Sequence, residues 1–87
     1  MKNFYVKCIL FDEYNNYIGI KKIGKYDANQ YENNAYVMVN SKEFLDDIKP
    51  KLLQFKEGNN IINNILIRRK DKSSIDPIII KLSSLEI

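Results

Sequence analysis

The basic and aromatic residues are the ones whose types and spacing could bind a partner. Arg68 and Arg69 stand next to Lys70, and a second basic pair is formed by Lys21 and Lys22. Six tyrosines are present, and exposed aromatic rings among cations can stack single-stranded bases. One hypothesis is therefore a nucleic-acid-binding surface at Lys21, Lys22, Arg68, Arg69 and Lys70. The formal net charge of +3, with eleven acidic residues, is modest for such a protein.

Codon usage weakens part of this signal. Lysine, asparagine, isoleucine and tyrosine dominate the 87 residues, and all four have codons rich in A and T. A genome of low GC content explains this bias without selection on the protein. The only two arginines, Arg68 and Arg69, run against the bias and are the more informative cations.

The parts of a catalytic site are missing from the sequence. There is no His, which is the commonest general base near neutral pH. The single cysteine, Cys8, lies in an apolar segment and is predicted to be a buried, inert thiol. The adjacent acids at 12–13 and at 46–47 do not face each other on a helix or a strand. We therefore predict that the protein is not an enzyme and has no catalytic residue, no metal site and no cofactor.

The first third of the chain predicts a β-hairpin. Phe4–Phe11 and Tyr17–Ile23 are rich in β-branched and aromatic residues, and Asp12–Asn16 between them is typical of a turn. A two-residue turn places Phe11 opposite Ile20, whereas a three-residue loop places Leu10 there. Because a slip of one residue turns every side chain to the other face, the sequence leaves the core face of the hairpin open.

The middle of the chain predicts a loop, a strand and a helix. Gly24–Asn34 is polar and is expected to be a loop, and Ala35–Val39 is expected to be a short strand. A helix follows, with Asn40 and Glu43 as a capping box. Its apolar stripe and its C-terminal stop are formed by Phe44, Leu45, Ile48, Leu52, Phe55, Gly58 and Asn59. Pro50 interrupts the helix, and since the stripe stays in phase across it, one kinked helix is favoured over two short ones.

Two further strands complete the predicted fold. They are Ile61–Arg69 and Pro77–Leu82, joined by a turn at Lys70–Asp76. The predicted order is β-β-β-α-β-β. It indicates one small α+β domain over residues 1–87, in which a kinked helix packs on one face of an antiparallel β-sheet of four to five strands.

The strands carry apolar residues on both faces, and one helix can cover only one of them. Either the 24–34 loop or the C-terminal Leu85–Ile87 folds over the second face, or that face meets another chain. The other chain would be a protein partner or a second copy in a homodimer.

The leading functional hypothesis is a non-catalytic protein-interaction module. Its expected partner-binding residues are Tyr26, Tyr31, Tyr36, Arg68 and Arg69, because Tyr and Arg are enriched at interface hot spots. Small proteins of this composition are common among phage and mobile-element accessory proteins, which suggests an inhibitor of a host factor such as a CRISPR defence system. Single-stranded nucleic-acid binding is the alternative. Without a signal peptide or an apolar run of membrane-spanning length, the expected location is cytoplasmic, with no membrane contact.

Overall fold

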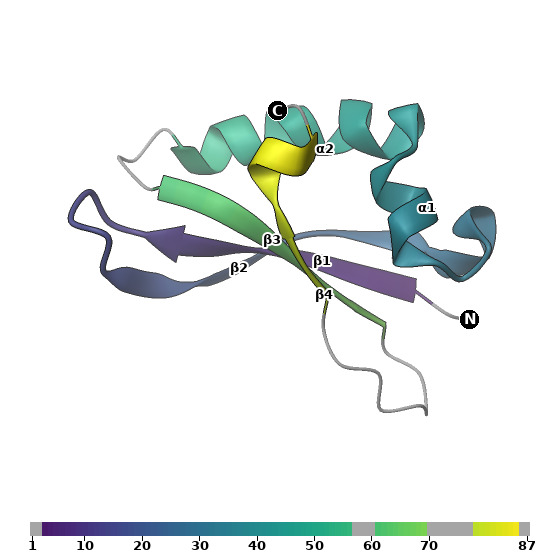
Figure 1. Cartoon of the computed structure of the whole chain (residues 1–87), viewed down its shortest axis with the longest axis horizontal. Coiled ribbons are helices and arrows are strands. Elements are labelled where there is room, and N and C mark those ends of the chain that lie inside the picture. The colour runs from purple at the N-terminus through teal and green to yellow at the C-terminus, as the bar shows by residue number, and fades with distance from the viewer. Residues whose placement is uncertain (1–2, 57–60, 70–77, 86–87) are drawn as a thin grey trace.

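The computed structural model describes residues 3–56, 61–69 and 78–85. Figure 1 shows the strands with the helices gathered on one side of them. In chain order the elements are β1 (Asn3–Phe11), β2 (Tyr17–Asp27), the 3-10 helix η1 (Ala28–Tyr31), α1 (Ala35–Val39), α2 (Lys42–Lys56), β3 (Ile61–Arg69), β4 (Ile78–Lys81) and the 3-10 helix η2 (Leu82–Leu85).

The strands form one antiparallel sheet in the order β2-β1-β3-β4. This confirms the predicted α+β class and a four-stranded antiparallel sheet with a helix on it. It also places β1 and β3 in the centre of the sheet, while β2 and β4 form its edges.

The core lies between the sheet and the helices. Every second residue of β1 is buried, from Phe4 to Leu10, whereas the residues between them are half-buried on the other face. The predicted stripe of α2 is confirmed, since Phe44, Ile48 and Leu52 have no exposed surface. From β3 and β4 the core receives Ile62, Ile65, Ile67 and Ile80.

The predicted third strand is wrong, because Ala35–Val39 forms helix α1. Its buried residues are Ala35, Met38 and Val39, at the i, i+3 and i+4 spacing of a helix. The Asn34 side chain accepts a hydrogen bond from the Tyr36 N–H, which caps the helix. If these five residues formed a strand, their burial would alternate from one residue to the next, as it does in β1.

The predicted loop at 24–34 is also largely structured. β2 continues to Asp27, which caps η1 by accepting a hydrogen bond from the Asn29 N–H. Ala28 and Tyr31 of η1 are buried in the core. Gly24–Asp27 therefore belong to the sheet itself and η1 packs on its helix side, so the expectation that the 24–34 segment covers the second face is wrong.

Both predicted hairpin registers are wrong, because Ile20 stands opposite Ile9. The strands are joined by the whole Asp12–Asn16 segment, in which the Asp12 N–H donates to the Asn16 carbonyl. The Asp12 carboxylate also accepts from the N–H groups of Tyr14 and Asn16. Asp12 thus stabilises a five-residue turn instead of the shorter turns considered.

The start of α2 differs from the predicted capping box. Asn40 ends α1, and Ser41 caps α2 by accepting a hydrogen bond from the Phe44 N–H at 3.2 Å. The helix then runs without interruption through Pro50, which confirms a single helix. Pro50 is exposed, so the carbonyl that loses its intrahelical partner lies on the solvent side.

Some predictions lie outside the described residues. These are the stop at Gly58 and Asn59, the turn at Lys70–Asp76, the start of the last strand at Pro77, and the end of the chain at 86–87. The side chain of Phe55 also belongs to this group.

Candidate functional site

The face of the sheet that lies opposite the helices is called the open face below. Residues that stand opposite each other on neighbouring antiparallel strands share a face, so the strand registers define it. It carries Tyr5, Lys7, Ile9 and Phe11 from β1, Tyr17, Ile20, Lys22 and Lys25 from β2, Ile61, Leu66 and Arg68 from β3, and Ile79 and Lys81 from β4.

Large apolar side chains on this face are exposed, as the sequence predicts. Ile20 exposes 46% of its surface and Ile79 exposes 59%. The elements that follow the strands, η1 and η2, instead contribute Tyr31 and Leu82 to the core on the helix side. Within the described part of the chain, no element packs over the open face.

A cationic depression surrounds one tyrosine on the open face. It has a volume of about 330 Å³ and is lined by Tyr5, Lys7, Lys22 and Arg68, and it is called the Tyr5 depression below. The Lys22 Nζ lies 5.2 Å from the centre of the Tyr5 ring, within the range of a cation–π contact. Arg68 stands opposite Tyr5 on β3, so cations flank the ring from both neighbouring strands.

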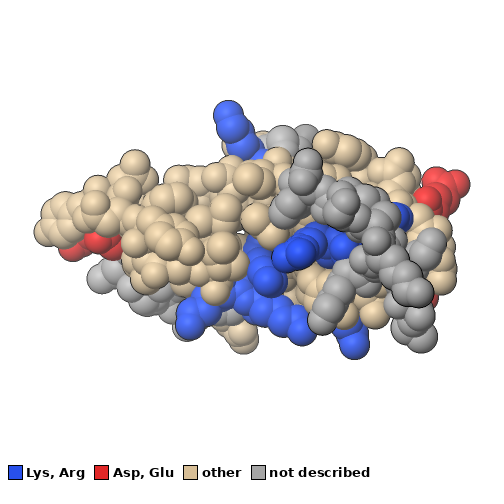
Figure 2. All heavy atoms as spheres, turned by 90° about the horizontal axis from the view of Figure 1, so that it is seen from below, with Lys and Arg blue, Asp and Glu red and all other residues tan. Residues whose placement is uncertain are grey.

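The charges in the Tyr5 depression repel one another. Lys7 and Lys22 stand directly opposite on neighbouring strands, an arrangement that destabilises a sheet when both residues carry the same charge. Neither lysine, nor Arg68, forms an ion pair with a carboxylate anywhere in residues 3–56, 61–69 and 78–85. Figure 2 shows the Lys and Arg side chains gathered on the middle of this face, with the acidic ones at its two ends. The arrangement favours an anionic ligand.

The other end of the open face is apolar and aromatic. The rings of Phe11 and Tyr17 meet edge to face, with their centres 6.3 Å apart. Ile9 and Ile20 stand opposite each other beside them. These four residues are called the apolar end, and together with the Tyr5 depression they give the open face two chemically different halves.

The structure separates the basic pairs that the sequence brings together. Arg68 lies on the open face, whereas Arg69 stands opposite the buried Phe4 and lies on the helix side. Likewise Lys22 faces the Tyr5 depression and Lys21 does not, since Lys21 stands opposite Cys8. Lys70 lies outside the described residues.

Two residues of the depression were missed by the sequence reasoning. Tyr5 and Lys7 alternate with the buried residues of β1, and this period of two is the signal that could have found them. The signal could not be used because the hairpin register was open.

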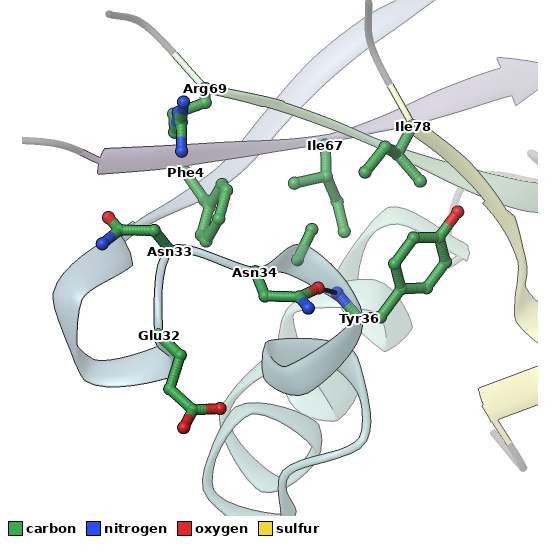
Figure 3. A pocket seen from close by; sticks show the side chains of 9 residues that line it. Phe4, Glu32, Asn33, Asn34, Tyr36, Ile67, Arg69 and Ile78 are labelled. Carbon is green, nitrogen blue, oxygen red and sulfur yellow. Dashed lines mark hydrogen bonds between the residues drawn. The ribbon is translucent and has the colours of Figure 1, made fainter. Parts of the chain in front are cut away.

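Tyr36 and Arg69, two predicted partner-binding residues, line a second cavity of about 300 Å³. Figure 3 shows them at its opposite ends, with Phe4 and Ile67 between them. Tyr36 is 58% exposed. This cavity lies on the helix side, so these residues and Arg68 do not belong to one surface.

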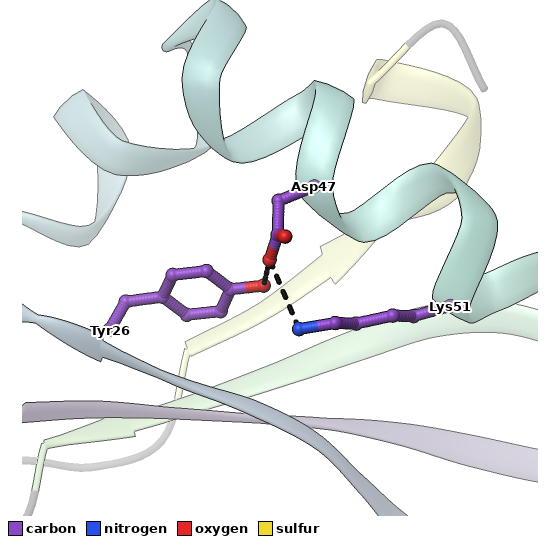
Figure 4. A network of polar contacts seen from close by, with 3 residues as sticks. All are labelled: Tyr26, Asp47 and Lys51. Carbon is purple, nitrogen blue, oxygen red and sulfur yellow. Dashed lines mark hydrogen bonds and ion pairs between the residues drawn. The ribbon is translucent and has the colours of Figure 1, made fainter.

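Tyr26 belongs to a polar network that holds α2 on the sheet (Figure 4). Its hydroxyl donates a 2.6 Å hydrogen bond to the Asp47 Oδ2, which also pairs with the Lys51 Nζ at 3.0 Å. Burial and the Asp47 charge raise the pKa of Tyr26, and the bonds from Tyr26 and Lys51 lower the pKa of Asp47. The ring also meets Phe44 edge to face at 5.0 Å.

The expectation that Tyr26 and Tyr31 lie on a loop is therefore wrong, because Tyr26 lies in β2 and Tyr31 in η1. Tyr31 exposes only 5% of its surface and packs in the core. Tyr26 is half-buried against α2. Their predicted role in binding a partner stays a prediction, although the structure gives both of them a role in the fold.

Cys8 is buried, as the sequence predicts, and burial raises the pKa of its thiol. A thiol of raised pKa in the core is poorly suited to act as a nucleophile.

Among the described residues, no group of three or more metal-ligating side chains comes together. The helices described also include none with the length and apolar character needed to cross a membrane.

Comparisons of this chain with models of protein families, with curated proteins and with solved structures found no match.

Proposed function

We propose that this chain is a non-catalytic binding module that takes single-stranded nucleic acid on the open face of its sheet. One observation carries the proposal. Tyr5 is surrounded by Lys7, Lys22 and Arg68, three cations without carboxylate partners in the described chain. A phosphate backbone would relieve the repulsion between these cations, and the ring between them offers a surface on which a base can stack.

The chemistry of the Tyr5 depression favours nucleic acid over a protein as the ligand. Lysine is depleted at protein interfaces, and two of the three cations around Tyr5 are lysines. A single strand fits better than a duplex, because its unpaired bases are free to meet the ring. Asp27 is the acid nearest to Tyr5 in the β1–β2 register, and its carboxylate is already bonded to the Asn29 N–H.

The test is the fluorescence anisotropy of a labelled oligothymidylate of about twelve nucleotides, a length within the range of single-strand binding sites. Lys22→Glu with Arg68→Glu removes two cations from the depression. The matched control is Lys42→Glu with Lys49→Glu, on the exposed side of α2. Each reversal replaces a positive by a negative charge, so both double variants change the net charge from +3 to −1.

The proposal predicts binding at low salt that weakens steeply between about 50 and about 200 mM salt, since each phosphate contact releases counterions. The Lys22 and Arg68 double variant should lose this binding, while the α2 double variant should keep most of it. Equal losses in both variants would mean that only net charge matters, and absence of binding by the unchanged protein at low salt would refute the proposal.

A second candidate function is docking of a protein on the apolar end, and exposed apolar surface favours it. Tyr17 and Ile20 expose 62% and 46% of their surfaces at this end of β2. Two copies would meet there with their cationic depressions apart, because those repel each other. Light scattering tests the homodimer: Ile20→Lys should convert it to a monomer, and a monomer for the unchanged protein at high concentration would exclude it. Inhibition of a host factor is a role within this second candidate and stays a prediction.

A further inference from the structure

We infer that Tyr5 and the cations around it bind different parts of one nucleotide unit, so that the ring stacks on a base while Lys7, Lys22 and Arg68 hold the flanking phosphates. The inference rests on the proposed function and adds to it how the Tyr5 depression distinguishes a single strand from any other polyanion. A surface that held phosphates alone would accept a duplex, heparin and a single strand alike.

The positions of the cations indicate the path of the strand. On β2, Lys25 stands opposite Tyr5 and Lys22 lies over its ring, while Arg68 stands opposite Tyr5 on β3. Neighbouring strands of a sheet are about 4.8 Å apart, so a nucleic-acid strand that crosses from β2 to β3 over β1 meets a cation before and after the ring. We therefore place the bound strand across the sheet strands at Tyr5.

Lys22 has to move for the base to reach the Tyr5 ring. Its cation–π contact with the ring is then lost, and this contact is weaker than the stacking contact that replaces it. An exposed cation–π contact contributes about 2- to 5-fold to an equilibrium, whereas a base stacked on an aromatic ring contributes about 5- to 150-fold to affinity. The released ammonium then lies within reach of the phosphate beside the stacked base. Lys22 thus covers the ring in the free protein and binds phosphate in the complex.

The test compares three substitutions by the same anisotropy titration, each at several salt concentrations. Tyr5→Leu removes the ring but keeps an apolar side chain, Tyr5→Phe keeps the ring, and Lys22→Gln keeps most of the stem but removes the charge. We expect Tyr5→Leu to weaken binding about 10-fold or more with an unchanged salt dependence. Tyr5→Phe should bind as the unchanged protein does. Lys22→Gln should reduce the slope of log K against log salt by about 0.7, the value for one phosphate contact of a single strand.

A different set of results would overturn the inference while leaving the proposed function intact. In that case Tyr5→Leu would bind with the affinity of the unchanged protein while Lys22→Gln would bind more weakly. This result would mean that the open face binds phosphates only. A loss in Tyr5→Phe as large as in Tyr5→Leu would likewise overturn it, because the hydroxyl and not the ring would then make the contact. The proposed function itself fails only if the unchanged protein binds no single strand.

Discussion

The same substitution placed on the two faces of the sheet tests the assignment of the core. Ile65 on β3 has no exposed surface and packs toward the helices, whereas Ile79 on β4 exposes 59% of its surface on the open face. Both are isoleucines in strands. Replacement of each by Thr keeps a β-branched side chain, which fits a strand, so the change in β-propensity is small at both positions.

The expected losses of stability differ several-fold. Ile65→Thr removes about two buried carbons at about 0.8 kcal/mol each and leaves a hydroxyl in the core, which costs a further 1–3 kcal/mol. The total is about 3 kcal/mol, out of about 4–13 kcal/mol expected for a domain of this size. Ile79→Thr removes carbons that are already more than half exposed and leaves its hydroxyl in water, so about 0.5 kcal/mol is expected.

Urea denaturation followed by far-UV circular dichroism measures both values. With a slope of about 1–1.5 kcal/mol/M, Ile65→Thr should lower the midpoint by about 2–3 M urea and Ile79→Thr by less than about 0.5 M. Equal losses in the two variants, or a larger loss in Ile79→Thr, would show that the open face is covered and that the core lies elsewhere than between the sheet and the helices.

Two further predictions concern ionisable groups on the helix side. Tyr26→Phe removes the hydrogen bond to Asp47 and should cost about 0.5–1 kcal/mol, since Asp47 is half exposed. Because the folded protein lowers the Asp47 pKa below its ordinary 3.8, this stabilisation is present above that pH and is lost as the pH falls through the lowered pKa. Urea midpoints should therefore differ between the two proteins at neutral pH and converge once the pH falls below the lowered Asp47 pKa, and a difference that persists after Asp47 is protonated would contradict the assignment. For Cys8, burial and a raised pKa predict slow reaction with a thiol reagent at about pH 8 in the native protein and fast reaction in urea; an equally fast native reaction would contradict its burial.

The sequence carried enough information for the fold class because periodicity is a local property. The stripe from Phe44 to Leu52 fixes the face of α2, and the predicted strand Ile61–Arg69 has the same bounds as β3. The prediction of a strand at Ala35–Val39 was wrong because three of its residues, one Tyr and two Val, favour strands. The helix there depends on Asn34 as a cap and on tertiary burial of Met38, which no local propensity records.

The candidate site was only partly predictable, because it depends on the hairpin register. Asp12 organises a five-residue turn through bonds to Tyr14 and Asn16, and the pairing of β1 with β2 then shifts between Leu10 and Phe11, which no local pattern records. Because the register was unknown, the adjacent cations Arg68 and Arg69 were interpreted as one cluster. Neighbouring residues of a strand point to opposite faces, so the two side chains lie apart. Tyr5 becomes a candidate only when the strands are placed.

The most direct test of the binding proposal is nuclear magnetic resonance on the complex with the oligothymidylate. We expect intermolecular nuclear Overhauser effects from thymine protons to the Tyr5 ring and to the Lys22 side chain, and none to the exposed side of α2. Contacts confined to the helix side, at Tyr36 or along α2, would show that the open face is not the binding surface.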